Sequence, residues 1–196
     1  MKSKTWIYRQ KSDQYVKKAK QLGYINRASF KLIELEQKFK LIKNSINIFE
    51  FGSSPGGWTH IIHEINRNSK ITCIDLLDMK IDNKNIKFIK KDFLVYDYSQ
   101  LDKDYDLILS DVAPNTTGHQ STDHLKISQL IYEIINRLEI ILKKNGSFIF
   151  KIWKGKEEKD IIKKLKLMFK TVNYFKPKSS RQESSEIFII AREFKL

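Results

Sequence analysis

The sequence has 196 residues and is 41% hydrophobic, which suits a single domain spanning residues 1–196. Its 37 basic and 23 acidic residues give a net charge of +14, so we expect an anionic partner of the polyphosphate type. The single cysteine, Cys73, excludes an internal disulfide framework and a cysteine-based zinc site. With no secretory leader and no apolar stretch of about 18 residues, we expect no membrane partner and an intracellular location, cytoplasmic or organellar as in a mitochondrion.

Helical and strand patterns alternate along the chain. In chain order they predict helices at 12–22 and 28–39, a strand at 46–51, a helix at 58–65, strands at 71–75, 86–89 and 105–110, a helix at 123–143, a strand at 147–153, a helix at 157–169, and strands at 171–175 and 186–191. A capping Ser12 is expected to begin the first helix, and Asn145-Gly146 to end the long one. This order predicts an α/β fold, with a doubly wound, mainly parallel seven-stranded sheet and helices on both faces. An antiparallel edge strand is expected because no helix joins the last two strands.

A glycine-rich turn, Gly52-Ser53-Ser54-Pro55-Gly56-Gly57, joins the first strand to a helix, where a ligand can approach the backbone and free N–H groups. Ser54 replaces the second glycine of the dinucleotide fingerprint G-x-G-x-x-G, which argues against a pyrophosphate ligand. Asp75 follows Gly57 by 18 positions, a spacing that suits hydrogen bonds to ribose, and Asp92 can bind a base amino group. The turn therefore predicts a nucleoside-type cofactor. A ligand-free turn, with strand-end capping by both aspartates, is the alternative.

The same turn matches G-x-S-x-G, the nucleophile elbow of α/β hydrolases. Ser54 would be the nucleophile, followed by Asp111 and then by His119 or His124 in the expected order. The oxyanion hole of that fold needs the N–H of the residue after the nucleophile, and Pro55 has none. A serine hydrolase is therefore the weaker alternative.

Charged residues occur at four positions where apolar ones are expected. They are Lys31 within a helix, Asp111 at the end of the strand 105–110, Lys151 inside the apolar run 148–153, and Glu186 at the start of the last strand. A buried lysine is costly unless it is paired. Desolvation and nearby carboxylates shift the pKa of a lysine in opposite directions, which is how a lysine can serve as a general base near neutral pH. For each residue alone, the alternative is a side chain that reaches solvent.

Six stretches resemble, in the same order, the motifs of the FtsJ/RrmJ family of S-adenosylmethionine-dependent RNA 2′-O-ribose methyltransferases, and they cover nearly the whole chain. They are DQYVK at 13–17, RASFKL at 27–32, PGGW at 55–58, DLL at 75–77, SDVAPN at 110–115, and the stretch 179–186. Such an ordered set is far more specific than one motif. The chain departs from the family at Ser53 and Ser54, where alanines are usual, and at Glu50, where aspartate is usual.

The resemblance implies a Rossmann-like methyltransferase fold with S-adenosylmethionine as the cofactor. It places a catalytic tetrad on Lys31, Asp111, Lys151 and Glu186. Lys151 would accept the proton of the 2′-hydroxyl, the acidic residues would orient the lysines, and Lys31 would position the ribose or a phosphate. The turn and the resemblance together predict cofactor contacts from Gly52, Ser54, Pro55, Gly56, Gly57, Trp58, Asp75, Leu76, Asp92, Phe93 and Asp111. No metal is expected, because the donor brings its own leaving group and because His60 and His63 lack a third ligand.

Basic and aromatic residues alternate in the N-terminal part of the chain, so a basic helical segment of about residues 1–40 is expected to contribute to RNA binding. The residues are Lys2, Lys4, Arg9, Lys11, Lys17, Lys18 and Lys20, with Trp6, Tyr8 and Tyr15. A solvated lysine-rich surface is the alternative. From the resemblance we expect a monomeric enzyme acting on a uridine in large-subunit ribosomal RNA. A tRNA or mRNA-cap methyltransferase and a non-catalytic RNA-binding protein are the alternatives.

Overall fold

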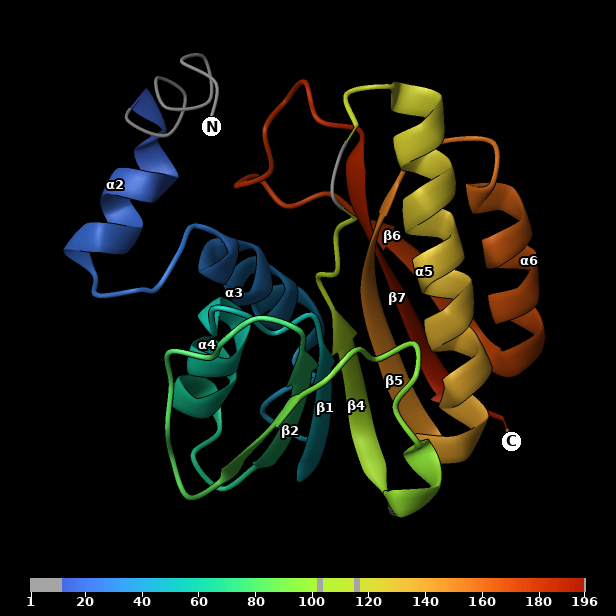
Figure 1. Ribbon diagram of the computed structural model, residues 1–196, viewed down its shortest axis with the longest axis horizontal. Helices are drawn as coiled ribbons and strands as arrows, with labels where there is room; N and C mark the ends of the chain where they lie inside the picture. Colours follow the sequence, from blue (N-terminus) through green and yellow to red (C-terminus); the bar gives the residue numbers. More distant parts are fainter. Residues whose placement is uncertain (1–11, 102–103, 115–116, 196) are drawn as a thin grey trace.

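A seven-stranded sheet forms the centre of the computed structural model, which describes residues 12–101, 104–114 and 117–195 (Figure 1). Its strands are β1 (Asn47–Phe51), β2 (Lys70–Asp75), β3 (Ile86–Lys90), β4 (Tyr105–Ser110), β5 (Leu142–Trp153), β6 (Phe169–Phe175) and β7 (Glu186–Phe194). They lie in the order β3-β2-β1-β4-β5-β7-β6, and among these strands β7 runs opposite to the other six. The predicted mainly parallel α/β sheet is confirmed. The antiparallel strand lies one position inside the edge, because β6 pairs with its outer side.

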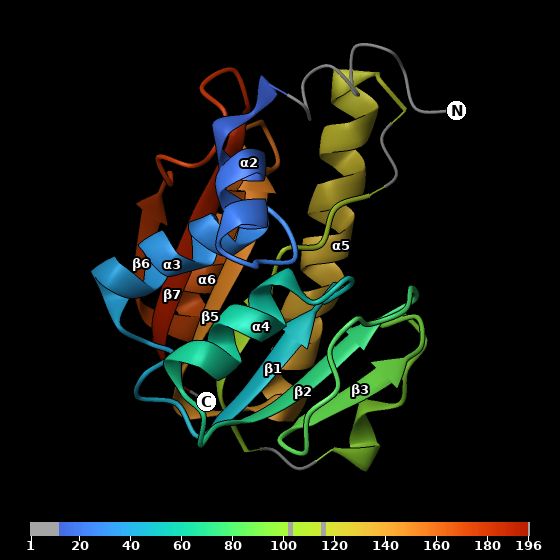
Figure 2. The same cartoon turned by 90° about the vertical axis from the view of Figure 1, so that its left-hand side faces the viewer.

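Helices cover both faces of this sheet. They are α2 (Gln14–Gln21), α3 (Ala28–Phe39), α4 (Gly57–Ile65), α5 (Gln120–Ile141) and α6 (Glu158–Met168), with a short 3-10 helix, η1 (Tyr98–Gln100). α5 and α6 pack on one face, and α3 and α4 on the other. Figure 2 shows that α2 lies over α3, outside the layer that touches the sheet. No described helix is both long enough and apolar enough to cross a membrane.

The central strands are buried on both faces, which explains their nearly unbroken apolar sequences. Successive residues of β1 enter opposite cores: Ile48 packs in the cluster under α3 and α4, and Phe49 in the cluster under α5. β3 at the edge is partly exposed along its length. The interior of the sheet is therefore apolar, and its polar chemistry is confined to strand ends and a few buried charges.

The first described helix, α2, begins at Gln14, two residues later than predicted, and its cap lies one residue later. Oδ1 of Asp13 accepts hydrogen bonds from the N–H groups of Tyr15 (2.9 Å) and Val16 (3.3 Å), so Asp13 caps α2 in place of Ser12. Several residues of the predicted basic segment lie outside the described residues: Lys2, Lys4, Trp6, Tyr8, Arg9 and Lys11.

The end of the long helix was also predicted wrongly. α5 ends at Ile141, and β5 begins at Leu142 without a loop. Asn145 and Gly146 lie within β5, where its register with β4 shifts. Asn145 has a φ of 63°, and a Cβ on Gly146 would lie 2.5 Å from the side chain of Leu142. The residues that resemble a helix end therefore form a bulge in a strand.

Glu50 is a titratable exception in the buried, apolar part of β1. The residue is 1% exposed, and its Oε2 accepts a hydrogen bond of 2.6 Å from Oγ1 of Thr59 in α4. Burial raises the pKa of Glu50 to about 8, although the bond from Thr59 lowers it, and the charges of Asp111 and Asp75 raise it further. Glu50 is therefore mainly protonated at neutral pH in the folded protein.

Replacing Glu50 by glutamine (Glu50→Gln) should remove a pH-dependent loss of stability. The pKa of Glu50 rises from its ordinary 4.5 to about 8 on folding, so the unfolded chain releases this proton first as pH rises. Between these values the group lowers the free energy of unfolding by about 1.4 kcal/mol per pH unit, and glutamine does not titrate. Urea unfolding at about pH 5, 6.5 and 8 should show that the free energy of unfolding of the variant, relative to that of the wild type, increases with pH. Glu139→Gln, at an exposed position of α5, should follow the wild type, and the prediction fails if Glu50→Gln does so too.

Candidate active site

A cavity of about 500 Å³ opens at the carboxyl ends of β1, β2 and β4. Ligands of doubly wound sheets bind at this edge, beside the point where the strand order reverses, which here lies between β1 and β4. The volume is within the usual range of small-molecule sites, roughly 300–1,000 Å³. The wall consists of Gly52, Ser54, Asp75, Leu76, Leu77, Asp92, Phe93, Leu94, Asp111, Val112, Ala113, Pro114 and Leu130. It includes seven of the predicted cofactor contacts: Gly52, Ser54, Asp75, Leu76, Asp92, Phe93 and Asp111.

Asp75 and the glycine turn hold each other in place. Oδ2 of Asp75 accepts a hydrogen bond from the N–H of Ser54 (2.9 Å), and Oδ1 accepts one from the N–H of Leu77 (2.8 Å). Gly52 has a φ of 71°, and a Cβ at this position would lie 2.7 Å from Cγ2 of Val112. The turn can therefore pass close to the next loop, and two backbone donors set the orientation of the carboxylate in the wall.

The other four predicted cofactor contacts, Pro55, Gly56, Gly57 and Trp58, do not line the cavity. A Cβ on Gly57 would lie 2.3 Å from the side chain of Asn26. The buried Trp58 donates a hydrogen bond from Nε1 to the carbonyl of Ala28 (2.9 Å), and its ring centre is 5.7 Å from that of Phe188. This end of the motif therefore packs α4 against α3 and the sheet, and it supports the turn on the side away from the cavity.

Two ion pairs, each with one buried and one half-buried residue, lie at or near the cavity, since Asp111 lines it and the charges of Lys151 and Lys31 both act on Asp111. Nζ of Lys151 donates to Oδ1 and to the backbone carbonyl of Asp111, each at 2.7 Å. Nζ of Lys31 donates to Oε2 of Glu186 at 2.7 Å, and Oε1 of Glu186 accepts a 2.7 Å bond from Oγ of Ser180. Lys151 is 6% exposed and Glu186 is 8% exposed. These hydrogen bonds offset the cost of removing the charges from water.

Both ion pairs lie on one patch of the sheet. The register of β5 and β7 places Lys151 opposite Phe188, and Glu186 lies two residues before Phe188 in β7, so the three side chains share a face. Lys31 reaches this patch from α3, with its Nζ 5.8 Å from the centre of the Phe188 ring. The structure thus brings together the four residues of the predicted tetrad, which come from α3, the end of β4, β5 and β7.

Asp111 belongs to both the cavity and the ion pairs. It lines the cavity, and it accepts the hydrogen bonds of Lys151. Burial raises the pKa of Asp111, but the charges of Lys151 and Lys31 and the bond from Lys151 outweigh burial and hold it below its ordinary value. Asp111 is therefore a charged carboxylate at the junction of the two parts of the site.

The geometry does not support a serine hydrolase. Oγ of Ser54 donates to a backbone carbonyl in the loop after β2 (3.0 Å), and Asp111 is engaged in its ion pair. His124 packs against Trp153, with 5.7 Å between the ring centres. In the described part of the chain, no hydrogen bond joins a histidine to Ser54 or Asp111. A triad needs a histidine between its nucleophile and its carboxylate. The Ser54 alternative is therefore not supported.

Sequence reasoning missed the residues that brace the ion pairs. Arg27 and Arg181 both approach Oδ2 of Asp13, at 2.8 and 3.3 Å, and tie the loop before β7 to the start of α2. Ser180, next to Arg181, holds Glu186. All of them lie in stretches that resemble family motifs, which was the available signal. Their pairing depends on contacts between distant parts of the chain, such as Asp13 and Arg181, which are 168 positions apart.

Known sequences match this chain over most of its length. The family model described as FtsJ-like methyltransferase matches residues 24–194. One curated relative is Ribosomal RNA large subunit methyltransferase E of Rickettsia africae (strain ESF-5). It is 38% identical over 200 residues, which cover 96% of this chain and 88% of the relative.

Solved structures agree with this result. A candidate ribosomal RNA methyltransferase from Plasmodium falciparum is 31% identical, with a TM-score of 0.77 and coverage of 87% of this chain and 98% of the other. Human methyltransferase-like protein 13, solved in complex with SAH, shares the fold at 14% identity and a TM-score of 0.57, with coverage of 86% and 82%. Because the family model spans most of its length, the chain belongs to the FtsJ-like methyltransferase family.

Proposed function

We propose that this protein transfers a methyl group from S-adenosylmethionine to a ribose 2′-hydroxyl of large-subunit ribosomal RNA, at a uridine. The observation that carries the proposal is the position of Asp111. Its carboxylate lines the cavity and holds Nζ of Lys151 at 2.7 Å, so the site for the methyl donor and the amine base both contact this residue. The names of the Rickettsia and Plasmodium relatives support the ribosomal substrate. The net charge of +14 suits RNA. We place the enzyme, as a monomer, in the compartment that assembles its ribosomes, the cytoplasm or an organelle.

The cavity wall fits S-adenosylmethionine. Its charged groups are three carboxylates: Asp75 would hold the ribose hydroxyls, Asp92 an amino group of the base, and Asp111 would lie nearest the positive charge. Phe93 and Val112 supply apolar surface for a flat ring. When bound, this cofactor supplies a methyl group on a positively charged sulfur, which is also the leaving group.

Lys151 would accept the proton of the 2′-hydroxyl, which is a weak nucleophile while it keeps that proton. Two hydrogen bonds to Asp111 direct Nζ, and in the amine form its lone pair remains for the substrate. The fixed charge of Asp111 then stabilises the ammonium that proton transfer creates.

Lys31 would position the target ribose or an adjacent phosphate. Its Nζ uses one donor on Glu186, which Ser180 holds from the other side, and within the described part of the chain its other two donors are left for the substrate. Holding both reactants in line supplies much of the rate of such a transfer.

The alternatives differ in substrate more than in chemistry. A tRNA or mRNA-cap ribose methyltransferase would use the same four residues. A non-catalytic RNA-binding protein has no use for two ion pairs that each contain a buried charge, because burying a charge costs free energy. The two ion pairs therefore favour an enzyme, and substrate comparison distinguishes the RNA classes.

Asp75→Ala should weaken S-adenosylmethionine binding about tenfold to a hundredfold, because hydrogen bonds to a charged group are worth roughly 1.5–3 kcal/mol. Titration calorimetry measures this, and a melting curve checks that the turn still folds. Asp78→Ala is the matched control, since this side chain is 82% exposed, pairs with Lys90 and does not line the cavity. Equal affinities for the wild type and Asp75→Ala would refute the assignment of Asp75.

Lys151→Ala should lower kcat about 10²- to 10⁴-fold and leave S-adenosylmethionine affinity nearly unchanged, because a general base acts in the transition state. Lys151→Arg keeps the charge beside Asp111 but cannot release a proton, so it should be equally inactive. Single-turnover methyl transfer and calorimetry separate the two effects. Lys154→Ala, at an exposed position three residues on, should behave as wild type. Normal turnover by Lys151→Arg would exclude Lys151 as the base.

Large ribosomal subunits from cells that lack the protein should be better methyl acceptors than protein-free ribosomal RNA or bulk tRNA. A surface that contacts phosphates selects RNA by shape, and a folded particle provides that shape. Initial rates with labelled S-adenosylmethionine give the ranking, and mass spectrometry should place the methyl group on a uridine ribose. A higher rate with tRNA would reject the ribosomal assignment and leave the methyl-transfer chemistry standing.

A further inference from the structure

A second hollow, of about 640 Å³, lies between α2, α3 and the end of β6, and shares no lining residue with the cofactor cavity. We call it the α2–α3 groove. Its floor is Phe30, whose ring centre is 5.3 Å from that of Tyr15 and 5.5 Å from that of Tyr24. Phe175 lines the side formed by β6. Both tyrosines and Phe175 are half-buried, so part of each ring remains accessible.

Lysines surround these rings. Nζ of Lys18 lies 5.4 Å from the centre of the Phe30 ring, and Nζ of Lys38 lies 4.9 Å from that of Phe175. Lys178 lines the groove as well. Glu34 is the one acidic residue among the described residues of the lining, and its oxygens accept backbone hydrogen bonds from Lys178 (2.5 Å) and the next residue (2.9 Å). Accessible rings bordered by exposed ammonium groups suit a nucleobase with its phosphates.

The groove and the Lys31–Glu186 pair lie on two sides of α3. Phe30 faces the groove, and Lys31, about 100° further round the helix, faces Glu186. The loop before β7 makes a second connection, since Lys178 lines the groove and Ser180 bonds to Glu186. A nucleotide next to a ribose held by Lys31 is therefore within reach of the groove.

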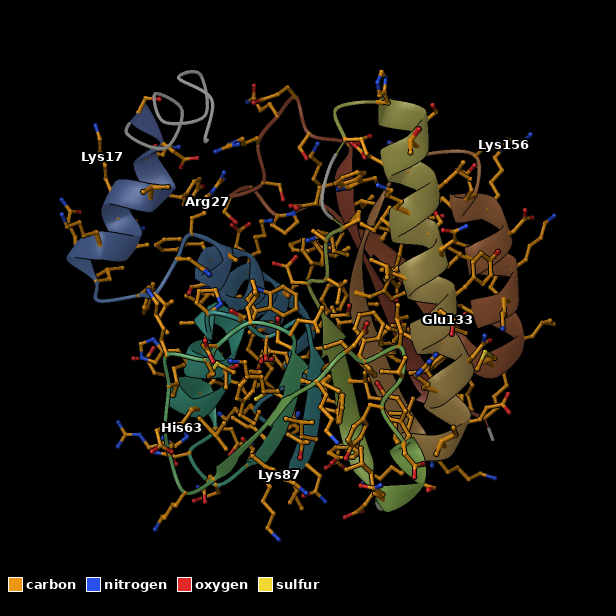
Figure 3. All side chains as sticks on the ribbon, viewed as in Figure 1. Lys17, Arg27, His63, Lys87, Glu133 and Lys156 are labelled. Carbon is orange, nitrogen blue, oxygen red and sulfur yellow. The ribbon has the colours of Figure 1, made fainter. Side chains whose placement is uncertain are left out.

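Ionic contacts fix α2 in place as one wall of the groove. Asp13 at the start of α2 pairs with Arg27 at 2.8 Å, and the guanidinium of Arg27 lies 5.9 Å from the centre of the Tyr15 ring. Figure 3 shows Arg27 near the junction of α2 and α3, while Lys17 points outward from α2. The aromatic walls are thus held in place before any ligand binds.

We propose that the α2–α3 groove binds an unpaired nucleotide beside the methylated ribose, with the base on the rings of Tyr15, Tyr24 and Phe175 and the phosphates on Lys18 and Lys38. This inference rests on the proposed RNA substrate and adds how the neighbouring single strand is held.

The test uses the full chain and a fluorescent single-stranded oligouridine, with binding followed by anisotropy at several salt concentrations. Tyr24→Ala combined with Phe175→Ala should lower affinity at least about fivefold, because stacked bases contribute strongly to single-strand binding. Tyr24→Phe should retain affinity, since it keeps the ring. Lys18→Ala combined with Lys38→Ala should reduce the slope of log affinity against log salt concentration by about 1.4, because each of the two lost phosphate contacts accounts for roughly 0.7. The same variants should raise KM for large subunits and leave S-adenosylmethionine affinity unchanged.

Two matched controls should behave as wild type. Tyr174→Ala removes a ring that is 45% exposed and that lies next to Phe175 but on the other face of β6. Lys84→Ala combined with Lys87→Ala removes exposed charges just before and within β3, and Figure 3 shows Lys87 far from α2.

The possible outcomes distinguish a failure of the groove inference from a failure of the proposed function. If the wild type methylates ribosomal RNA and the groove variants keep normal affinity and KM, the groove inference is overturned and the function stands. Normal oligouridine affinity with a raised KM on subunits would assign the groove to a ribosomal protein and also overturn the inference. A wild type that neither binds nor methylates RNA overturns both.

Discussion

The buried pairing of Lys151 with Asp111 is the constraint on which the rest of the site depends. A lysine in a strand that is buried on both faces costs free energy unless acceptors meet its charge. Asp111 provides both acceptors, and it does so because β4 ends at Ser110, which pairs with Phe150 of β5 and leaves the next residues of the two strands side by side. Since Asp111 also lines the cavity, the β4–β5 register sets the distance between the base and the cofactor site.

The antiparallel strand completes the site because of its direction. β1, β2 and β4 end at the edge where the cavity opens, so they supply residues from their carboxyl ends. β7 runs the other way and begins at that edge, where Glu186 lies opposite Trp153 of β5. A parallel strand in this place would carry Glu186 and the preceding loop, with Ser180, to the opposite end of the sheet. The antiparallel direction of β7 next to β5 therefore allows the second ion pair to form beside the first.

Local patterns predicted the order of the elements, the glycine turn and the charged residues at strand ends. They failed where distant packing decides between two local options. Asn145-Gly146 is a common helix end, but burial of Leu142 in the sheet starts β5 before it. The motif around Trp58 indicates a ligand site, yet which of its residues touch the cavity depends on α3 and β7, which pack against it. Ser180 lies in a stretch that resembles a family motif, but its role comes from its hydrogen bond to Glu186, which the local sequence does not indicate.

Charge is divided over this molecule in a way that suits two reactants of opposite sign. The chain carries a net charge of +14, yet the charged groups of the cavity wall are the carboxylates of Asp75, Asp92 and Asp111. Glu50 lies nearby, and its raised pKa keeps it from adding another negative charge at neutral pH. Under the proposed function, the acidic wall attracts the cationic cofactor and repels phosphates, which the exposed lysines attract. The two signs meet at the Lys151–Asp111 and Lys31–Glu186 pairs. Electrostatics therefore directs each reactant to its own surface, and the ion pairs mark the place where the surfaces join and the methyl group is transferred.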